Sequence, residues 1–182
     1  ITQTVKGICK QNKNKTFSFA KDEEEKAKLW TARKVALWST IQYGKENIDP
    51  NINIWSTDVA VPISKFVEAL EETKKDIADA GLVSSIVGHA GDGNYHALIL
   101  YKDDQREIAS RLVKNMVDKA IKLDGTVTGE HGVGVGKKEF LVQELGEETI
   151  GLMRKIKFAM DPHSILNPDK VIAIDPVNDR SI

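Results

Sequence analysis

The dipeptide Asp92-Gly93, set between two apolar segments, is the feature that most constrains how this chain folds. Asp-Gly is among the strongest short signals for a two-residue type I′ turn that joins antiparallel strands. The flanking segments 83–89 and 95–101 carry the β-branched and large apolar residues of strands, so we expect a β-hairpin. With a two-residue loop, His89 lies directly opposite His96, with the two Cβ atoms about 5 Å apart on one face.

Helical and extended patterns alternate on both sides of this hairpin. Asp22 and Glu25 form a capping-box pattern, which predicts a helix that starts there and ends before Gly44. Further expected helices span residues 64–80, 103–123, 137–145 and 147–160, with a weak one over 1–12. Short strands are expected over 16–20, 58–63 and 126–128, an irregular loop over 44–55, and an extended tail after Pro162. This order predicts the α+β class, with a mainly antiparallel sheet and helices packed on it.

Length and composition exclude several classes of protein. The 182 residues suffice for one domain with a real core, and the net charge of −1 gives no reason to expect nucleic-acid binding. No apolar run approaches the roughly 18 residues that a membrane-spanning helix needs. The single cysteine, Cys9, excludes an internal disulfide. Because the chain begins with Ile1 and not with Met, we expect a processed product or an excised domain.

Three of the four histidines lie in the segments GHAGDGNYH (88–96) and TGEHG (128–132). Two histidines on a largely apolar ribbon need polar partners, which are either a divalent metal or hydrogen bonds within the core. Two neutral nitrogens and the carboxylate of Glu130 suit Zn²⁺, with Mn²⁺ and Fe²⁺ as alternatives. Adjacent side chains of an extended segment point to opposite sides, so we expect Glu130 at the metal and His131 at a substrate. A solvated loop histidine is the alternative for His131.

The glycine-rich segment TGEHGVGVGKK does not fit a nucleotide-binding loop. A phosphate-binding loop needs a glycine five residues before its Gly-Lys-Ser/Thr, but His131 stands five residues before Gly136 and Lys138 follows Lys137. Lys137 also stands where the dinucleotide fingerprint needs its third glycine. These glycines therefore indicate a tight turn near something bulky.

Arg33 is the remaining candidate residue. In the helix that begins near Asp22, Trp30, Arg33, Leu37 and Ile41 follow the spacing of one helical face, which places a guanidinium among apolar side chains. One interpretation is an arginine that reaches past the apolar surface to solvent. The other is an inward-pointing group that binds a carboxylate through paired hydrogen bonds.

Five segments together resemble the C-terminal domain of the FAD-linked 2-hydroxy-acid dehydrogenases of the vanillyl-alcohol oxidase type. They are LWTARK (29–34), STDVAVPIS (56–64), GHAGDGNYH (88–96), GTVTGEHGVGVGKKEFL (125–141) and MDPHSILNPDK (160–170). The resemblance implies a ferredoxin-like cap domain that covers residues 1–182 and binds substrate and metal.

The resemblance also assigns roles to individual residues. His89, His96 and Glu130 match the family's metal ligands, and His131 matches its catalytic base. Arg33 matches the arginine that holds the substrate carboxylate. Asn167 falls where the family's chain returns toward the flavin, which makes it a cofactor-binding candidate.

Two departures from the family pattern are informative. Relatives that act on D-2-hydroxyglutarate carry a lysine two residues before the aspartate of DVAVP, to hold the distal carboxylate. Ser56 stands at that position, which favours a short monocarboxylate such as D-lactate. Asp169 stands where glycine is usual, so we expect an altered turn in the tail.

The function implied by the resemblance is the oxidation of D-lactate to pyruvate in mitochondria, with cytochrome c as the electron acceptor. The family binds FAD mainly through a separate N-terminal domain that these residues do not contain, so we expect this chain alone to be inactive. The alternatives are a related oxidation of glycolate or D-2-hydroxyglutarate, a zinc hydrolase, and a non-catalytic metal-binding module. The histidine spacing lacks the helical HExxH arrangement of many zinc hydrolases, which disfavours that reading.

Overall fold

The computed structural model describes residues 1–14 and 17–175, and the chain divides into two compact units, Ile1–Ala36 and Leu37–Ile182. The first unit contains helix α1 (Thr2–Gln11) and the start of helix α2 (Glu23–Asn47). The expected cap is present, because Asp22 Oδ1 accepts a hydrogen bond of 2.9 Å from the Glu25 N–H. The expected strand over 16–20 is not confirmed: residues 17–20 are irregular, and Thr16 lies outside the described residues.

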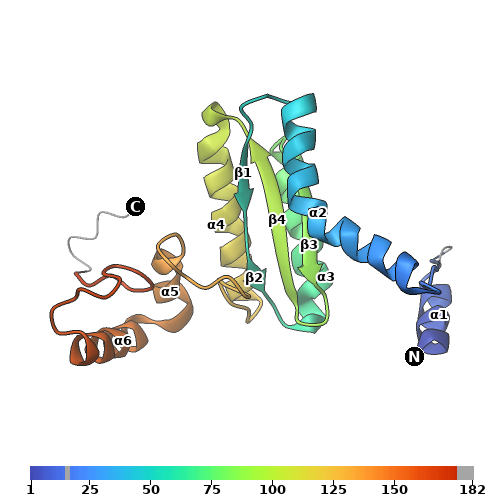
Figure 1. Cartoon of the computed structure of the whole chain (residues 1–182). Helices are drawn as coiled ribbons and strands as arrows, with labels where there is room; N and C mark the ends of the chain where they lie inside the picture. The colour runs from blue at the N-terminus through green and yellow to red at the C-terminus, as the bar shows by residue number, and fades with distance from the viewer. Residues whose placement is uncertain (15–16, 176–182) are drawn as a thin grey trace. The chain divides into compact units, whose positions relative to one another are not determined.

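The second unit is built on an antiparallel sheet (Figure 1). Its strands are β1 (Asn53–Ser56), β2 (Val59–Ala60), β3 (Val83–His89) and β4 (Asn94–Tyr101). β4 pairs with β3 on one side and with β1 and β2 on the other. β1 and β2 keep one register along β4, so they are two segments of one strand, and Ala60 bridges to Thr126 on its outer side. This strand order is that of a ferredoxin-like fold, which confirms the expected α+β class.

The helices of this unit follow the expected pattern closely. They are α3 (Phe66–Asp79), α4 (Arg106–Lys122), α5 (Lys138–Leu145) and α6 (Glu147–Met160), with 3₁₀ turns at Ile63–Lys65 and Asp103–Gln105. No helix in the part of the chain that the structure describes is long and apolar enough to cross a membrane. The tail differs from the expectation: it forms successive turns, and Asn167 and Asp169 both have positive φ angles.

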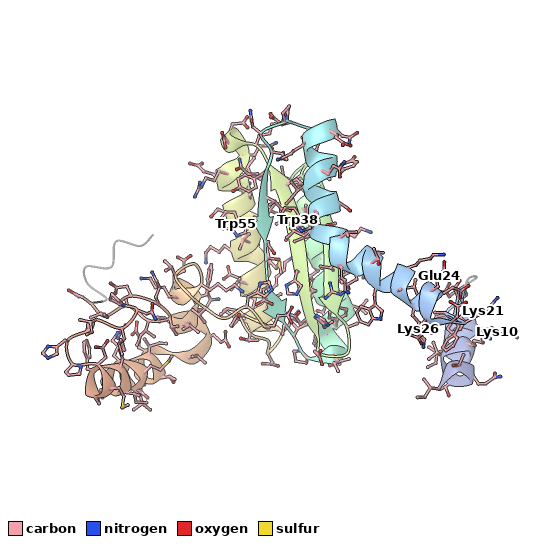
Figure 2. The ribbon with its side chains drawn as sticks, viewed as in Figure 1. Lys10, Lys21, Glu24, Lys26, Trp38 and Trp55 are labelled. Atoms are coloured by element: carbon pink, nitrogen blue, oxygen red, sulfur yellow. The ribbon has the colours of Figure 1, made fainter. Side chains whose placement is uncertain are left out.

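The two faces of the sheet have different coverings. Tyr95, Ala97 and Ile99 alternate on one face and join the apolar core formed with α3 and α4. On this side Trp55 of β1, labelled in Figure 2, lies with its ring centroid 6.1 Å from that of Tyr101. The opposite face carries His96 and Leu98. The candidate site therefore lies on the face of the sheet that points away from α3 and α4.

The C-terminal part of α2 covers part of that second face. Thr40 on α2 lies 2.6 Å from Ser85 on β3, hydroxyl to hydroxyl. The sequence predicts that this helix ends before Gly44, but α2 continues to Asn47. Gly44 is buried, and a Cβ there would lie 2.9 Å from Ile52 and 3.0 Å from Leu100. Its lack of a side chain therefore serves close packing of helix on sheet.

Candidate functional site

The hairpin forms, but its register differs from the prediction. His96 pairs with Val87, and His89 pairs with Asn94, so residues 90–93 form a longer loop than the predicted turn. Gly93 explains the difference. Its φ is +70°, its carbonyl accepts a 3.0 Å hydrogen bond from the Val61 N–H, and a Cβ there would lie only 1.9 Å from the Val61 carbonyl oxygen. The glycine is required for contact with the chain beyond β2 as well as for the turn.

The corrected register leaves His89 and His96 on one face of the sheet, because a shift of two residues preserves the side of each side chain. They are diagonal neighbours and not directly opposite. Glu130 lies between them: its Oε1 is 2.9 Å from His96 Nε2, and its Oε2 is 3.7 Å from His89 Nε2. The structure therefore brings together the three residues predicted as metal ligands.

The orientation of His96 is fixed by the backbone of Thr57, between β1 and β2. The His96 Nδ1 lies 3.0 Å from the Thr57 carbonyl oxygen, and His96 is only 5% exposed. A carbonyl oxygen can only accept, so Nδ1 must carry the hydrogen. Nε2 is therefore the atom available to a proton or a metal on the side of Glu130. Metal-binding histidines typically donate their second ring N–H in this way.

His131 joins the same cluster from the loop after Thr126. Its ring stacks on that of His96, with centroids 4.8 Å apart and an interplanar angle of 9°. The His131 Nε2 lies 3.8 Å from Glu130 Oε1, and the side chain is 53% exposed. The imidazole is thus held beside the candidate metal position and is open to solvent on its other side.

Asp58, next to Thr57, is the centre of the hydrogen-bond network under this loop. The side chain is 1% exposed, and its carboxylate accepts hydrogen bonds from the backbone N–H groups of Gly129, Glu130 and His131 at 2.9–3.2 Å. Burial alone would raise the pKa of Asp58. The His131 N–H, the Asn94 amide and the charge of Lys137 outweigh it, so the pKa lies well below the ordinary value.

A second set of possible metal ligands overlaps the first. One ligand atom each from Asp58, His96 and His131 lies within 4.8 Å of the other two. The Asp58 oxygens are already occupied by N–H donors, and Lys137 Nζ lies 3.3 Å from Oδ2. Glu130, with a half-exposed carboxylate that faces both histidines, is the better oxygen donor for a cation.

The other two predicted site residues lie in different parts of the chain. Arg33 is on α2 in the Ile1–Ala36 unit and is partly buried, while its neighbour Trp30 is 63% exposed. Asn167 is exposed in the tail after α6, with a φ of 48°.

Sequence reasoning missed Thr57 and Asp58 as site residues. One signal was available: Asp58 is a charged residue at the start of the apolar segment VAVPI, where a buried carboxylate needs several donors. Apart from the Asn94 amide, 36 residues away, those donors lie 70 or more residues further along the chain, at Thr128 and in the loop that follows it. The partnership is therefore invisible to local patterns.

The chain is similar to known proteins over most of its length. The sequence model of the family described as FAD linked oxidases, C-terminal domain, matches residues 1–171. Two relatives named mitochondrial D-lactate dehydrogenase (cytochrome), from Kluyveromyces lactis and Saccharomyces cerevisiae, are 54% and 51% identical over 97% of this chain. A protein of that name from Arabidopsis thaliana is 40% identical over 94% of the chain. The chain spans about 30% of the length of each of these relatives.

Proposed function

The chain belongs to the FAD linked oxidases, whose C-terminal domain it contains, and on this premise we propose that it is the substrate- and metal-binding part of a D-lactate dehydrogenase. The complete enzyme oxidises D-lactate to pyruvate, passes the electrons to cytochrome c and works in the mitochondrion. The names of the yeast relatives support this proposal, as does their identity above 50% across nearly the whole chain. FAD is bound mainly by a separate domain of the complete protein.

The observation that carries the proposal is the position of Glu130 between two histidines. His89, His96 and Glu130 offer two imidazole nitrogens and one carboxylate, a ligand set that suits Zn²⁺. The donor set fits a cation for a second reason. Among the described residues, Asn94 Oδ1 is a buried polar atom without a hydrogen-bond partner, and Asn94 pairs with His89 in the sheet. This unpaired oxygen, two residues before His96 on β4, is a further acceptor that a cation could satisfy.

The cation and FAD would supply one part of the chemistry, and residues of this chain supply the other. When bound, the cation would polarise the 2-hydroxyl group of the substrate and lower its pKa, and FAD would accept the hydride from C2. His131 takes the hydroxyl proton as the C2 hydrogen leaves with its electron pair, which yields the keto group of pyruvate. A positioned base of this kind typically contributes about 10²–10⁴ in rate.

The remaining residues select and orient the substrate. Arg33 binds the substrate carboxylate, since a guanidinium forms paired hydrogen bonds with it. Ser56 pairs with Leu98 and so lies on the same sheet face as His96. Its short side chain offers no positive charge to a second carboxylate, which favours D-lactate over D-2-hydroxyglutarate. Asn167, in the tail, would help to hold the flavin.

The test uses the full-length protein, purified and analysed for metal and flavin. Reduction of cytochrome c by D-lactate is expected, with much weaker reduction by glycolate and D-2-hydroxyglutarate, and chelation of the metal should abolish it. Re-addition of Zn²⁺ should restore the activity, with Mn²⁺ as the comparison. A protein that holds metal but oxidises none of these acids would refute the proposal and favour a hydrolase or a metal-binding module.

A further inference from the structure

We propose that Asp58 is a positioning residue, which holds the loop of Glu130 and His131 against the sheet and thereby sets the site's affinity for its cation. This inference rests on the proposed function, because it assumes that Glu130 is a metal ligand and that His131 is the base. It adds a residue that touches neither the substrate nor the metal and acts through the backbone.

The contacts of Asp58 are concentrated on the segment that carries the chemistry. Oδ2 accepts hydrogen bonds from the Thr128 hydroxyl at 2.9 Å, from the Gly129 N–H at 2.9 Å and from the His131 N–H at 3.0 Å. The Glu130 N–H lies 3.2 Å from both carboxylate oxygens. Consecutive N–H groups that converge on one anion fix the backbone conformation of the whole segment.

The loop needs this anchor because the two side chains that connect it to His96 are half exposed. Glu130 and His131 are 48% and 53% exposed, and Gly132 and Gly134 follow with positive φ angles. Gly129 fits tightly, since a Cβ there would lie 1.8 Å from Asn94 Nδ2 and 2.8 Å from Asp58 Oδ1. The backbone is thus pressed against the buried carboxylate, while the half-exposed side chains of Glu130 and His131 face His96.

The adjacent residues Thr57 and Asp58 position both halves of the site. The Thr57 carbonyl orients His96, and the adjacent Asp58 carboxylate orients the loop that presents Glu130 to it. The break between β1 and β2 falls at these two residues, although the Thr57 N–H still donates to the Ala97 carbonyl at 3.1 Å. A displacement of Asp58 would therefore change the distance between Glu130 and His96 directly.

The charged groups around Asp58 indicate that it anchors the loop and does not bind the cation. Lys137 Nζ lies 3.3 Å from Asp58 Oδ2 and 2.6 Å from the Asp58 carbonyl oxygen. The carboxylate is therefore neutralised by a lysine and saturated by N–H donors on one oxygen. A cation at Asp58 would have to displace several of these donors, whereas the Glu130 carboxylate contacts histidine rings that can themselves bind a cation.

The first variant is Asp58→Asn in the full-length enzyme, which keeps the size but turns an amide toward the N–H donors. We expect Zn²⁺ affinity, measured by competition with a chelator, to fall about 10–100-fold. With saturating Zn²⁺, kcat of this variant should remain below that of the unaltered enzyme, because His131 is displaced. KM for D-lactate should change little, because Arg33 is not displaced. Thr128→Val, which removes one hydrogen bond and no charge, should weaken Zn²⁺ binding about fivefold.

Asp161→Asn is the matched control. Asp161 is 5% exposed, accepts hydrogen bonds from the Ile165 and Leu166 N–H groups and pairs with Lys157 at 2.6 Å. It anchors a loop in the same way, and its contacts among the described residues are with Lys157, Ser164, Ile165 and Leu166 and not with the histidine cluster. Its loss should lower the melting temperature without weakening Zn²⁺ binding, which separates positioning of the site from general stability.

Two results would overturn the proposal. One is Zn²⁺ affinity and kcat in Asp58→Asn and Thr128→Val equal to those of the Asp161→Asn control. The other is a Glu130→Gln enzyme that retains Zn²⁺ while Asp58→Asn loses it, which would make Asp58 a ligand. Because Zn²⁺ binding is measured without substrate, a full-length protein that oxidises no hydroxy acid would refute the proposed function and leave this test intact.

Discussion

Glu130 Oε1 lies 2.9 Å from His96 Nε2, and this contact joins a half-exposed loop residue to a histidine buried on the central strand 34 positions earlier. The second oxygen of the same carboxylate faces His89 at 3.7 Å. One side chain therefore connects both imidazoles of the hairpin. The position of the loop decides whether the two histidines and the carboxylate can share a cation.

Replacement of Glu130 by glutamine tests its role as a ligand. The amide keeps the size of the side chain but lacks the negative charge, so metal retention should fall more than about tenfold. Because Glu130 is 48% exposed, the free energy of unfolding should change by less than about 0.5 kcal/mol. Metal content after dialysis and a urea unfolding curve measure the two effects.

Glu147→Gln, at the exposed start of α6, is the control for loss of one negative charge. It should retain the metal of the unaltered protein. Equal metal content in the Glu130 and Glu147 variants would remove Glu130 from the ligand set.

Replacement of His131 by alanine tests its role as the base. In the full-length enzyme we expect kcat to fall about 10²–10⁴-fold, because no other group takes the hydroxyl proton. Metal content should be unchanged, since His131 stacks on His96 and is not one of the three proposed ligands. Steady-state oxidation of D-lactate and metal analysis of the same sample provide both readouts.

His163→Ala is the matched control, because His163 is the remaining histidine and lies exposed in the tail. Its turnover should equal that of the unaltered enzyme. Near-normal turnover in His131→Ala would assign the proton transfer to another group.

Tyr95 gives the stability of the chain a dependence on alkaline pH. The side chain is fully buried, its hydroxyl lies 3.0 Å from Thr73 Oγ1, and burial raises its pKa. An unfolded tyrosine ionises near pH 10. The folded tyrosine keeps its proton, whereas ionisation lowers the free energy of the unfolded state. The free energy of unfolding therefore falls as the pH rises above about 10.

The measurement compares urea unfolding of the original chain and of Tyr95→Phe at neutral pH and near pH 11. Phenylalanine removes both the titration and the hydrogen bond to Thr73, so the variant should be about 1 kcal/mol less stable at neutral pH. Its stability should fall less steeply with pH. Parallel pH profiles for the two chains would show that Tyr95 does not contribute.

Local patterns predicted most elements of this fold because apolar periodicity is a local property, but β1 (Asn53–Ser56) begins within the irregular loop expected over 44–55. The arms at 83–89 and 95–101 became β3 and β4, and the stripe of Leu112, Met116 and Ala120 is buried on α4. Capping chemistry likewise placed the start of α2 at Asp22, which bonds the Glu25 N–H.

Glycine was the main source of error, because the reason for a glycine can lie in a distant segment. Gly44 was read as the end of a helix, but it lies within α2 and allows Ile52 and Leu100 to approach. Gly93 was read as half of a two-residue turn, but it also meets the Val61 carbonyl. Neither contact can be inferred from the residues next to the glycine.

The candidate site was predictable to the extent that its residues carry distinctive chemistry. His89, His96 and Glu130 were expected together, and the structure brings them together despite the altered register. Asp58 was missed because a lone aspartate has many ordinary roles. Its importance depends on N–H donors more than 70 positions away, which only the folded chain reveals.

Ser56 provides a test of substrate choice. It lies at the end of β1, on the sheet face of the histidines, and is exposed. Replacement by lysine would supply an ammonium group for the distal carboxylate of D-2-hydroxyglutarate. A charged hydrogen bond of this kind is worth about 1.5–3 kcal/mol, so kcat/KM for that acid should rise about 10–100-fold in the full-length enzyme.

Ser56→Met separates the charge from the length of the new side chain. Methionine fills similar space without a hydrogen-bond donor. Both replacements should lower kcat/KM for D-lactate, because each fills space near the site, but only lysine should raise kcat/KM for D-2-hydroxyglutarate. Competition between the two acids in one assay gives the ratio directly. If lysine and methionine change that ratio equally, the second carboxylate is not bound near Ser56, and selection between the acids must come from another part of the complete enzyme.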